Sequence, residues 1–151
     1  MSTLPKLDDW PERLNEYLTE IVGMPFVWGQ HDCVLAALNA VKVMTGVDYA
    51  LEIREKYSTA LGAVRVMVRL YGVDSLSSAA DVFCKKYEGE EVPISFAQRG
   101  DIVEADVVSA EGGTGPSLGV VDLDGIHALF AGPSGAIRIK ITDCLRAWRV
   151  G

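Results

Sequence analysis

Hydrophobic residues recur at helical spacing through the first ninety residues of the chain, and this pattern predicts five helices. The expected helices span residues 10–22, 32–45, 49–57, 59–71 and 75–87. The first carries Pro11 in its opening turn, where proline is favoured. Gly46 and Gly72 directly follow the second and fourth segments, the usual place of glycine after a helix.

Two of these segments make specific predictions about packing. Segment 32–45 is apolar on nearly all sides, so we expect a buried helix with Asp32 as its N-cap. Segment 59–71 is expected to begin at the cap Ser58 and to turn five apolar side chains inward. They are Leu61, Val64, Val66, Met67 and Leu70.

After an acidic linker at residues 88–93 the pattern changes to short apolar runs bounded by Gly, Pro and Asp, which is typical of strands. The expected strands are 101–103, 118–122, 126–130, 136–140 and 146–150. Asp124-Gly125 indicates a tight hairpin turn between the second and third of them. Helices followed by an antiparallel sheet predict one α+β domain over 1–151, helical in 1–91 and β in 92–151, with the helix at Cys33 packed on the sheet.

Composition narrows the function classes. The 151 residues carry a net charge of −7 without a basic cluster, which disfavours nucleic acid as a partner. No apolar run is long enough for a membrane span, and the N-terminus lacks a secretion signal, so we expect synthesis in the cytoplasm. Three cysteines without a CxxC pair predict neither a disulfide framework nor a bound metal or other cofactor.

Cys33 is the candidate nucleophile. It directly follows the expected N-cap, and the N-terminus of a helix favours thiolate over thiol. A nucleophilic cysteine needs a base within hydrogen-bond reach, and the chain has two histidines, His31 and His127. The competing interpretation is that Cys33 is a small buried residue of a packed helix.

The segment Phe26–Cys33, which ends in Trp-Gly-Gln-His-Asp-Cys, resembles the nucleophile segment of NlpC-type cell-wall cysteine peptidases. The segments Arg99–Val103, Ser117–Val121, Ile126–Ala128 and Ala147–Val150 are similar to later strands of that family. The resemblance implies a papain-like, NlpC-like fold over residues 24–151. It also implies that Cys33 is the nucleophile and that His127 is the polar group that orients the base.

One departure from the family is decisive for the chemistry. Ser117 stands where the family has its base histidine, and a serine hydroxyl cannot accept a proton near neutral pH. The site is therefore expected to be degenerate. Either His127 or His31 has replaced the base, or the domain has kept the fold and lost hydrolysis.

A second resemblance covers nearly the whole chain. The segments Trp28–Cys33, Thr45–Asp48, Arg54–Thr59 and Ala147–Val150, together with Gly100-Asp101, are similar to an uncharacterised family of small phage and prophage proteins. This resemblance implies a tail-associated structural or assembly protein whose partners are other tail proteins. It implies synthesis in the host cytoplasm followed by incorporation into the virion tail.

Three functional hypotheses stay open. The first is a non-enzymatic tail protein, and the second is a cysteine hydrolase that acts on peptidoglycan with His127 or His31 as base. A papain-like acyltransferase or amidase outside phage biology is the third. Residues 112–116 are expected to form a mobile loop over the site, and Cys84 and Cys144 are expected to be small buried residues.

Overall fold

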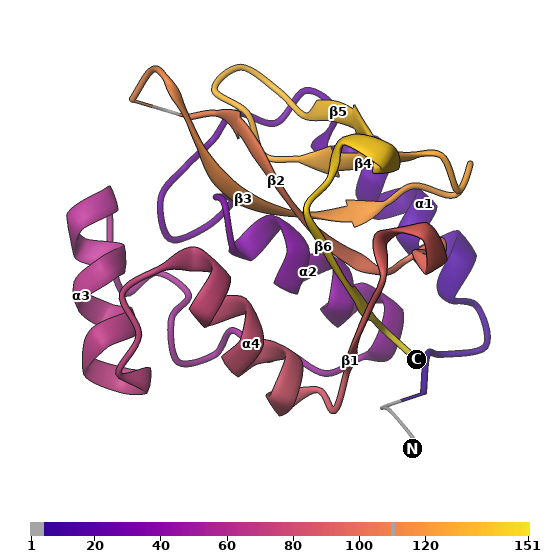
Figure 1. Cartoon of the computed structure of the whole chain (residues 1–151), viewed down its shortest axis with the longest axis horizontal. Helices are drawn as coiled ribbons and strands as arrows, with labels where there is room; N and C mark the ends of the chain where they lie inside the picture. The colour runs from indigo at the N-terminus through magenta and orange to yellow at the C-terminus, as the bar shows by residue number, and fades with distance from the viewer. Residues whose placement is uncertain (1–4, 110) are drawn as a thin grey trace.

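The protein is described by a computed structural model, which covers residues 5–109 and 111–151. Within them, four α-helices precede a six-stranded antiparallel sheet (Figure 1). The helices are α1 (Trp10–Ile21), α2 (Leu35–Thr45), α3 (Ala60–Tyr71) and α4 (Leu76–Lys86). The strands are β1 (Glu90–Val92), β2 (Ile102–Val108), β3 (Thr114–Val121), β4 (His127–Phe130), β5 (Ile137–Lys140) and β6 (Arg146–Arg149). The expected α+β class is confirmed.

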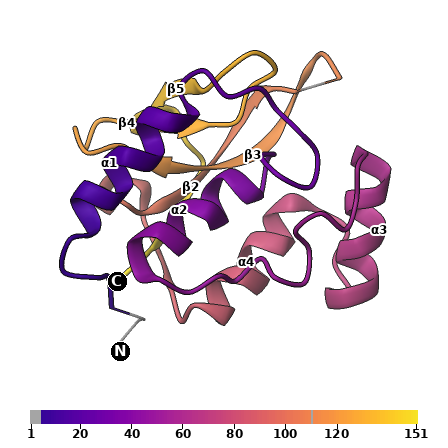
Figure 2. The same ribbon diagram turned by 180° about the vertical axis from the view of Figure 1, so that it is seen from behind.

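The sheet has the strand order β1-β6-β2-β3-β4-β5, and every pairing is antiparallel. Helix α2 lies against β3, with α1 and α4 on either side of it, while α3 stands apart at the edge far from α1 (Figures 1 and 2). The other face of the sheet is covered by two short 3-10 turns, Ile94–Phe96 and Ile141–Asp143.

Helix α2 is buried, as the sequence predicts. Eight of its 11 residues are buried, and Gly46 ends the helix in the left-handed conformation that glycine adopts without strain. Val41 and Met44 join one core cluster with α1 and the sheet, whereas Leu35 and Leu38 join a second cluster with α3 and α4. The helix that follows Cys33 is therefore the centre of the domain.

The prediction of a helix at residues 49–57 is wrong. The segment forms successive turns instead, with hydrogen bonds such as Ile53 to Ala50 and Lys56 to Ile53. The reason is tertiary, because the amide of Glu55 donates to the carbonyl of Gly29, 2.8 Å away, and Glu55 has a positive φ of 60°. This segment thereby supports the loop before α2.

The predicted inward face of α3 is also wrong in part. Only Val66 and Met67 of the five expected side chains are buried, and Leu61, Val64 and Leu70 are exposed. Helix α3 packs on the domain through a narrow face, so most of its apolar residues have no protein neighbour that covers them. Its cap is Thr59, whose hydroxyl accepts the amide of Gly62, and not Ser58.

Three corrections concern the β half. Strand β1 lies within the expected acidic linker and pairs with β6, so the sheet begins at Glu90 and not after residue 92. Strands β2 and β3 are both longer than expected. Strand β2 extends to Val108, and Thr114, Gly115 and Pro116 belong to β3 and not to a loop. The connection around Asp124-Gly125 is a turn but spans residues 122–126, longer than the tight hairpin predicted.

Candidate functional site

The turn that presents Cys33 is built around the buried carboxylate of Asp32. One carboxylate oxygen accepts the amides of Val34 and Leu35 at 3.0 and 2.8 Å, which is how a capping side chain holds the start of a helix. The other oxygen accepts the amide of Gly29 at 2.9 Å and the hydroxyl of Tyr57 at 2.7 Å. Four donors thus fix the conformation of this turn.

Helix α2 begins at Leu35, three residues later than expected, although Asp32 performs the predicted capping. Cys33 therefore lies in the turn before the helix and not in its first turn. Its carbonyl accepts the amide of Leu118 in β3 at 2.8 Å. The backbone of Cys33 therefore lies beside β3, beyond the part of β3 that pairs with β4. The cysteine is held directly against the sheet.

Cys33 and Ser117 are brought together by this contact, as the order of the motifs predicts. Both line a cavity of about 180 Å³, together with Trp28 and the hairpin residue Glu111. The hydroxyl oxygen of Ser117 is buried and has no hydrogen-bond partner in the described part of the chain. A serine hydroxyl cannot remove a proton from a thiol near neutral pH, so Ser117 supplies no base to this cavity.

The electrostatics of the cleft favour the neutral thiol. Burial, the adjacent carboxylate of Asp32 and the more distant Glu111 together raise the pKa of Cys33 to about 12. These groups favour the competing interpretation, in which Cys33 is a small residue of a packed core. Because Cys33 lies before the first turn of α2, burial and the neighbouring negative charge dominate the pKa of its thiol.

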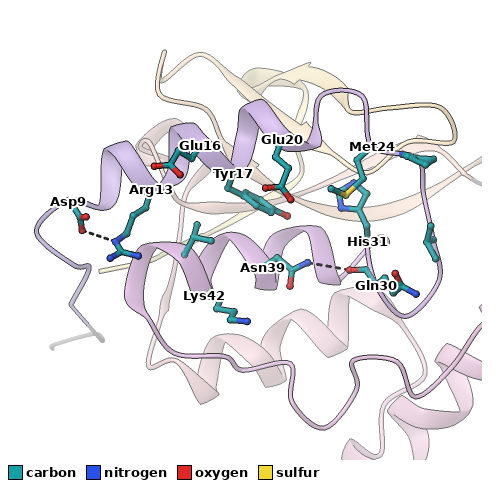
Figure 3. Close-up of a pocket in the computed structure, with 13 residues that line it drawn as sticks. Asp9, Arg13, Glu16, Tyr17, Glu20, Met24, Gln30, His31, Asn39 and Lys42 are labelled. Atoms are coloured by element: carbon teal, nitrogen blue, oxygen red, sulfur yellow. Dashed lines mark hydrogen bonds and ion pairs between the residues drawn. The ribbon is translucent and has the colours of Figure 1, made fainter.

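His31 is two residues from Cys33 in sequence but belongs to a different cavity. It is 3% exposed and lines a groove of about 810 Å³ between α1 and α2, whereas Cys33 is not part of that groove (Figure 3). Both of its ring nitrogens are buried without a hydrogen-bond partner among the described residues. Burial lowers the pKa of His31, although Asp32 opposes this effect. The structure does not bring this imidazole to the sulfur.

His127 lies at the far end of the β3–β4 hairpin. Its carbonyl accepts the amide of Asp122, four residues along β3 from the contact of Cys33 with Leu118. At 3.3 Å per residue this separation is about 13 Å, which excludes proton transfer. The imidazole of His127 instead contacts Asp124 at 2.8 Å, and Arg138 contacts the same carboxylate at 2.7 Å.

Two grooves meet at Cys33. Besides the cavity beside Ser117, an apolar groove of about 410 Å³ runs from Cys33 between α3 and α4. Trp28, Cys33 and Pro116 line both spaces, and the indole of Trp28 donates to Glu111 at 2.9 Å across the cleft. Glu111 carries no motif signal in the sequence, so this cleft wall could not be found without the structure.

The motif around Gly100 has a structural role. The buried carboxylate of Asp101 accepts the amides of Gln98 and Val150 and an Nε–H of Arg149 at 3.0 Å. Burial raises the pKa of Asp101, although these hydrogen bonds act in the opposite direction. This aspartate joins the start of β2 to the C-terminal strand and lies outside the cleft.

The remaining candidates are structural. Cys84 and Cys144 are buried, as expected, and burial raises the pKa of each thiol to about 11. Across the residues that the structure describes, no group of three His, Cys, Asp or Glu side chains is arranged to hold a metal ion. None of the described helices has the length and apolar character that crossing a bilayer requires.

The fold and the site define an α+β domain in which a capped turn holds a cysteine between a buried helix and an antiparallel sheet. The chain belongs to the family described as domain of unknown function DUF6950, which it matches over residues 5–150. No curated protein and no solved structure matches the chain.

Proposed function

We propose that this chain is a tail-associated structural or assembly protein of a phage or prophage, built on an NlpC-like, papain-like domain that does not hydrolyse peptides. Its partners on this proposal are other tail proteins. It is made in the host cytoplasm and then incorporated into the virion tail. The phage context comes from the resemblance of the sequence, and the loss of hydrolysis comes from the site.

The arrangement of the cleft supports the papain-like part of the proposal. Such a domain needs a cysteine at the head of a buried helix that packs on an antiparallel sheet, with a polar residue beside the sulfur. Cys33 precedes α2, contacts β3 through its carbonyl and shares a cavity with Ser117. These positions are the ones that the resemblance to NlpC-type peptidases implies for the nucleophile and the base, although Ser117 is not a base.

The observation that carries the proposal is the separation of both imidazoles from the sulfur. His31 lines another groove, and its ring nitrogens contact no partner among the described residues. His127 pairs with Asp122, about 13 Å along the strand from Leu118, and its imidazole is held by Asp124. With its pKa raised to about 12, Cys33 is a thiol at neutral pH, and no imidazole lines the cleft among the residues that the structure describes. A cysteine hydrolase requires both a thiolate and a general acid for the leaving group.

The second candidate function is a cysteine hydrolase that acts on peptidoglycan. The observation in its favour is that Cys33 is partly exposed in a cleft, with open grooves on both sides of the sulfur. For this candidate to hold, the loop around His31 must rearrange when substrate binds.

Incubation with peptidoglycan stem peptides separates the two functions. We expect no cleavage by the native chain, Cys33→Ser or the control Cys144→Ser, with products resolved by liquid chromatography and mass spectrometry. Cleavage by the native chain that Cys33→Ser abolishes and Cys144→Ser retains would contradict the proposal. The tail assignment is tested separately by mass spectrometry of purified tails, in which the chain is expected at a fixed ratio to known tail proteins.

A further inference from the structure

Helix α3 exposes an unusual amount of apolar surface. Leu61, Val64 and Val68 are 59%, 42% and 48% exposed, respectively. At 100° per residue these three positions fall within about 60° of one another around the helix axis, so they form one stripe. The helix also stands apart at the edge of the domain, where both views leave this region free of other elements (Figures 1 and 2). A contiguous exposed apolar surface is typical of a binding site.

The stripe continues into the apolar groove that ends at Cys33. Val64 belongs to both, because it lines the groove together with Ala60, Ala63 and Met67 from the neighbouring face of α3. The opposite wall comes from Leu76 and Ala79 of α4. The groove and the stripe therefore form one surface that extends well beyond a cavity of about 410 Å³, which fits a polypeptide segment better than an enclosed small molecule.

The charges on α3 indicate which segment fits. The helix carries Arg65 and Arg69, both exposed, and no acidic residue, although the whole chain has a net charge of −7. Arg65 lies next to the apolar stripe on the helix surface, and Arg69 lies one helical turn after Arg65. The lining of the groove contains one charged side chain, that of Asp74, which directly precedes the cap Ser75 of α4. The border of the stripe is therefore positive.

This pattern argues against a second copy of the chain as the occupant. In a two-fold interface with antiparallel α3 helices, Arg65 and Arg69 of both subunits lie along the same border of the contact. Like charges along one border weaken such an interface. A partner with carboxylates at the matching positions relieves this repulsion.

We propose that the groove and the stripe on α3 are the docking surface for a segment of another protein, which places a large apolar side chain between α3 and α4 and an Asp or Glu against Arg65 and Arg69. That the partner is a tail protein rests on the proposed function. The surface itself is defined by residues that the hydrolytic chemistry does not use, apart from Cys33 at the inner end of the groove.

A peptide-display selection on the full chain tests this proposal. From a library of random 12-residue peptides, we expect enrichment of sequences that combine a Leu, Met, Phe or Trp anchor with a nearby Asp or Glu. A synthetic peptide of the enriched sequence should bind Ala63→Phe, which fills the groove, at least tenfold more weakly than the native chain. The matched control Asn15→Phe, which adds the same side chain to exposed α1, should bind normally.

The charge requirement is tested by reversal. The double variant Arg65→Glu/Arg69→Glu should lose the acidic peptides and enrich peptides with Lys or Arg beside the same apolar anchor. Circular dichroism checks that each variant is folded, which is expected because both arginines are exposed.

Three results overturn the docking proposal. The first is enrichment of no anchor motif, or of peptides whose affinity is the same for Ala63→Phe and the native chain. The second is a dimer in sedimentation analysis that Val64→Asp dissociates, since the occupant is then a second copy. The third is binding of dodecanoate in the groove while no peptide competes with it. None of these results depends on stem-peptide cleavage, so this proposal and the proposed function fail separately.

Discussion

The polar groups on the two sides of Cys33 differ in the number of hydrogen bonds that they make. On the side of the turn, the carboxylate of Asp32 receives four hydrogen bonds, and the hydroxyl of Tyr57 is one of the donors. On the side of the sheet, the Ser117 hydroxyl has no partner among the described residues. The structure therefore fixes the turn that carries the cysteine and leaves the nearby hydroxyl unpaired.

The comparison also shows that support and activation oppose each other at this site. Asp32 fixes the turn, but its negative charge is also a cause of the raised pKa of Cys33. An active cysteine peptidase offsets such a cost with an imidazolium beside the sulfur. Ser117 provides no such charge.

The largest effect is expected from removal of the supporting carboxylate. Asp32→Ala leaves four donors without their acceptor and should lower the free energy of unfolding by about 3–5 kcal/mol. Ser117→Ala removes a hydroxyl that has no partner, so we expect a change of less than about 1 kcal/mol. Urea unfolding followed by circular dichroism measures both. Equal losses in the two variants would show that the two sides of Cys33 do not differ in this way.

The backbone of the same turn is the next test. Gly29 has φ +84°, and an added Cβ would lie 2.4 Å from the carbonyl oxygen of Tyr57. Gly72 has a similar φ of +70° but open space around it. We expect Gly72→Ala to cost about 1 kcal/mol for the left-handed conformation, and Gly29→Ala to cost about 1–3 kcal/mol more for the clash. A similar unfolding midpoint for both variants would mean that the turn is not tightly held against Tyr57.

Restoration of an imidazole sharpens the contrast. Cys33 and Ser117 line the same cavity of about 180 Å³, so Ser117→His adds an imidazole to its lining. A protonated imidazole there favours the thiolate, so we expect the pKa of Cys33 to fall by at least about one unit and its alkylation rate at pH 8 to rise about tenfold. Ser117→Asn is the control, since it adds similar bulk without charge. The interpretation of Ser117 is wrong if His and Asn give the same rate.

The smallest effect is expected at the ion pair of His127 with Asp124. Burial acts against ionisation of Asp124, but the amides of His127 and Ile126 and the His127 imidazole together lower its pKa to about 2. Because folding lowers the pKa of Asp124, the ionised carboxylate stabilises the fold above pH 3.8, the ordinary pKa of the group. This contribution is lost as the pH falls towards 2. Because the carboxylate is partly exposed, we expect Asp124→Ala to cost about 1 kcal/mol at pH 7 and nothing near pH 2. A cost independent of pH would contradict this account of the hairpin.

Much of the fold could be predicted because its signals are local. The apolar character of segment 32–45 and the glycine at position 46 define the buried helix α2. Cys33 and Ser117, which the family resemblance assigns to one site, line the same cavity. Strand β1 was missed because its residues are acidic and partly exposed, and only pairing with β6 makes them a strand.

What could not be predicted depends on contacts between distant segments. Residues 49–57 have helical spacing, but the hydrogen bond of Glu55 to Gly29 selects turns. The apolar residues of α3 follow the pattern of a core helix, and no local rule says that Leu61 and Val68 lack neighbours. The raised pKa of Cys33 also depends on the tertiary structure, because burial and the charge of Asp32 act on a sulfur that lies before α2 and not in its first turn.

The pH dependence of Cys33 alkylation tests the central claim most directly. The native protein is treated with iodoacetamide between pH 6 and 10, and the modified cysteine is identified by peptide mass spectrometry. With the pKa of Cys33 raised to about 12, the rate at this residue should rise through the whole range without a plateau. A plateau with its midpoint at or below the ordinary value of about 8.5 would reveal an activated thiolate and contradict the account.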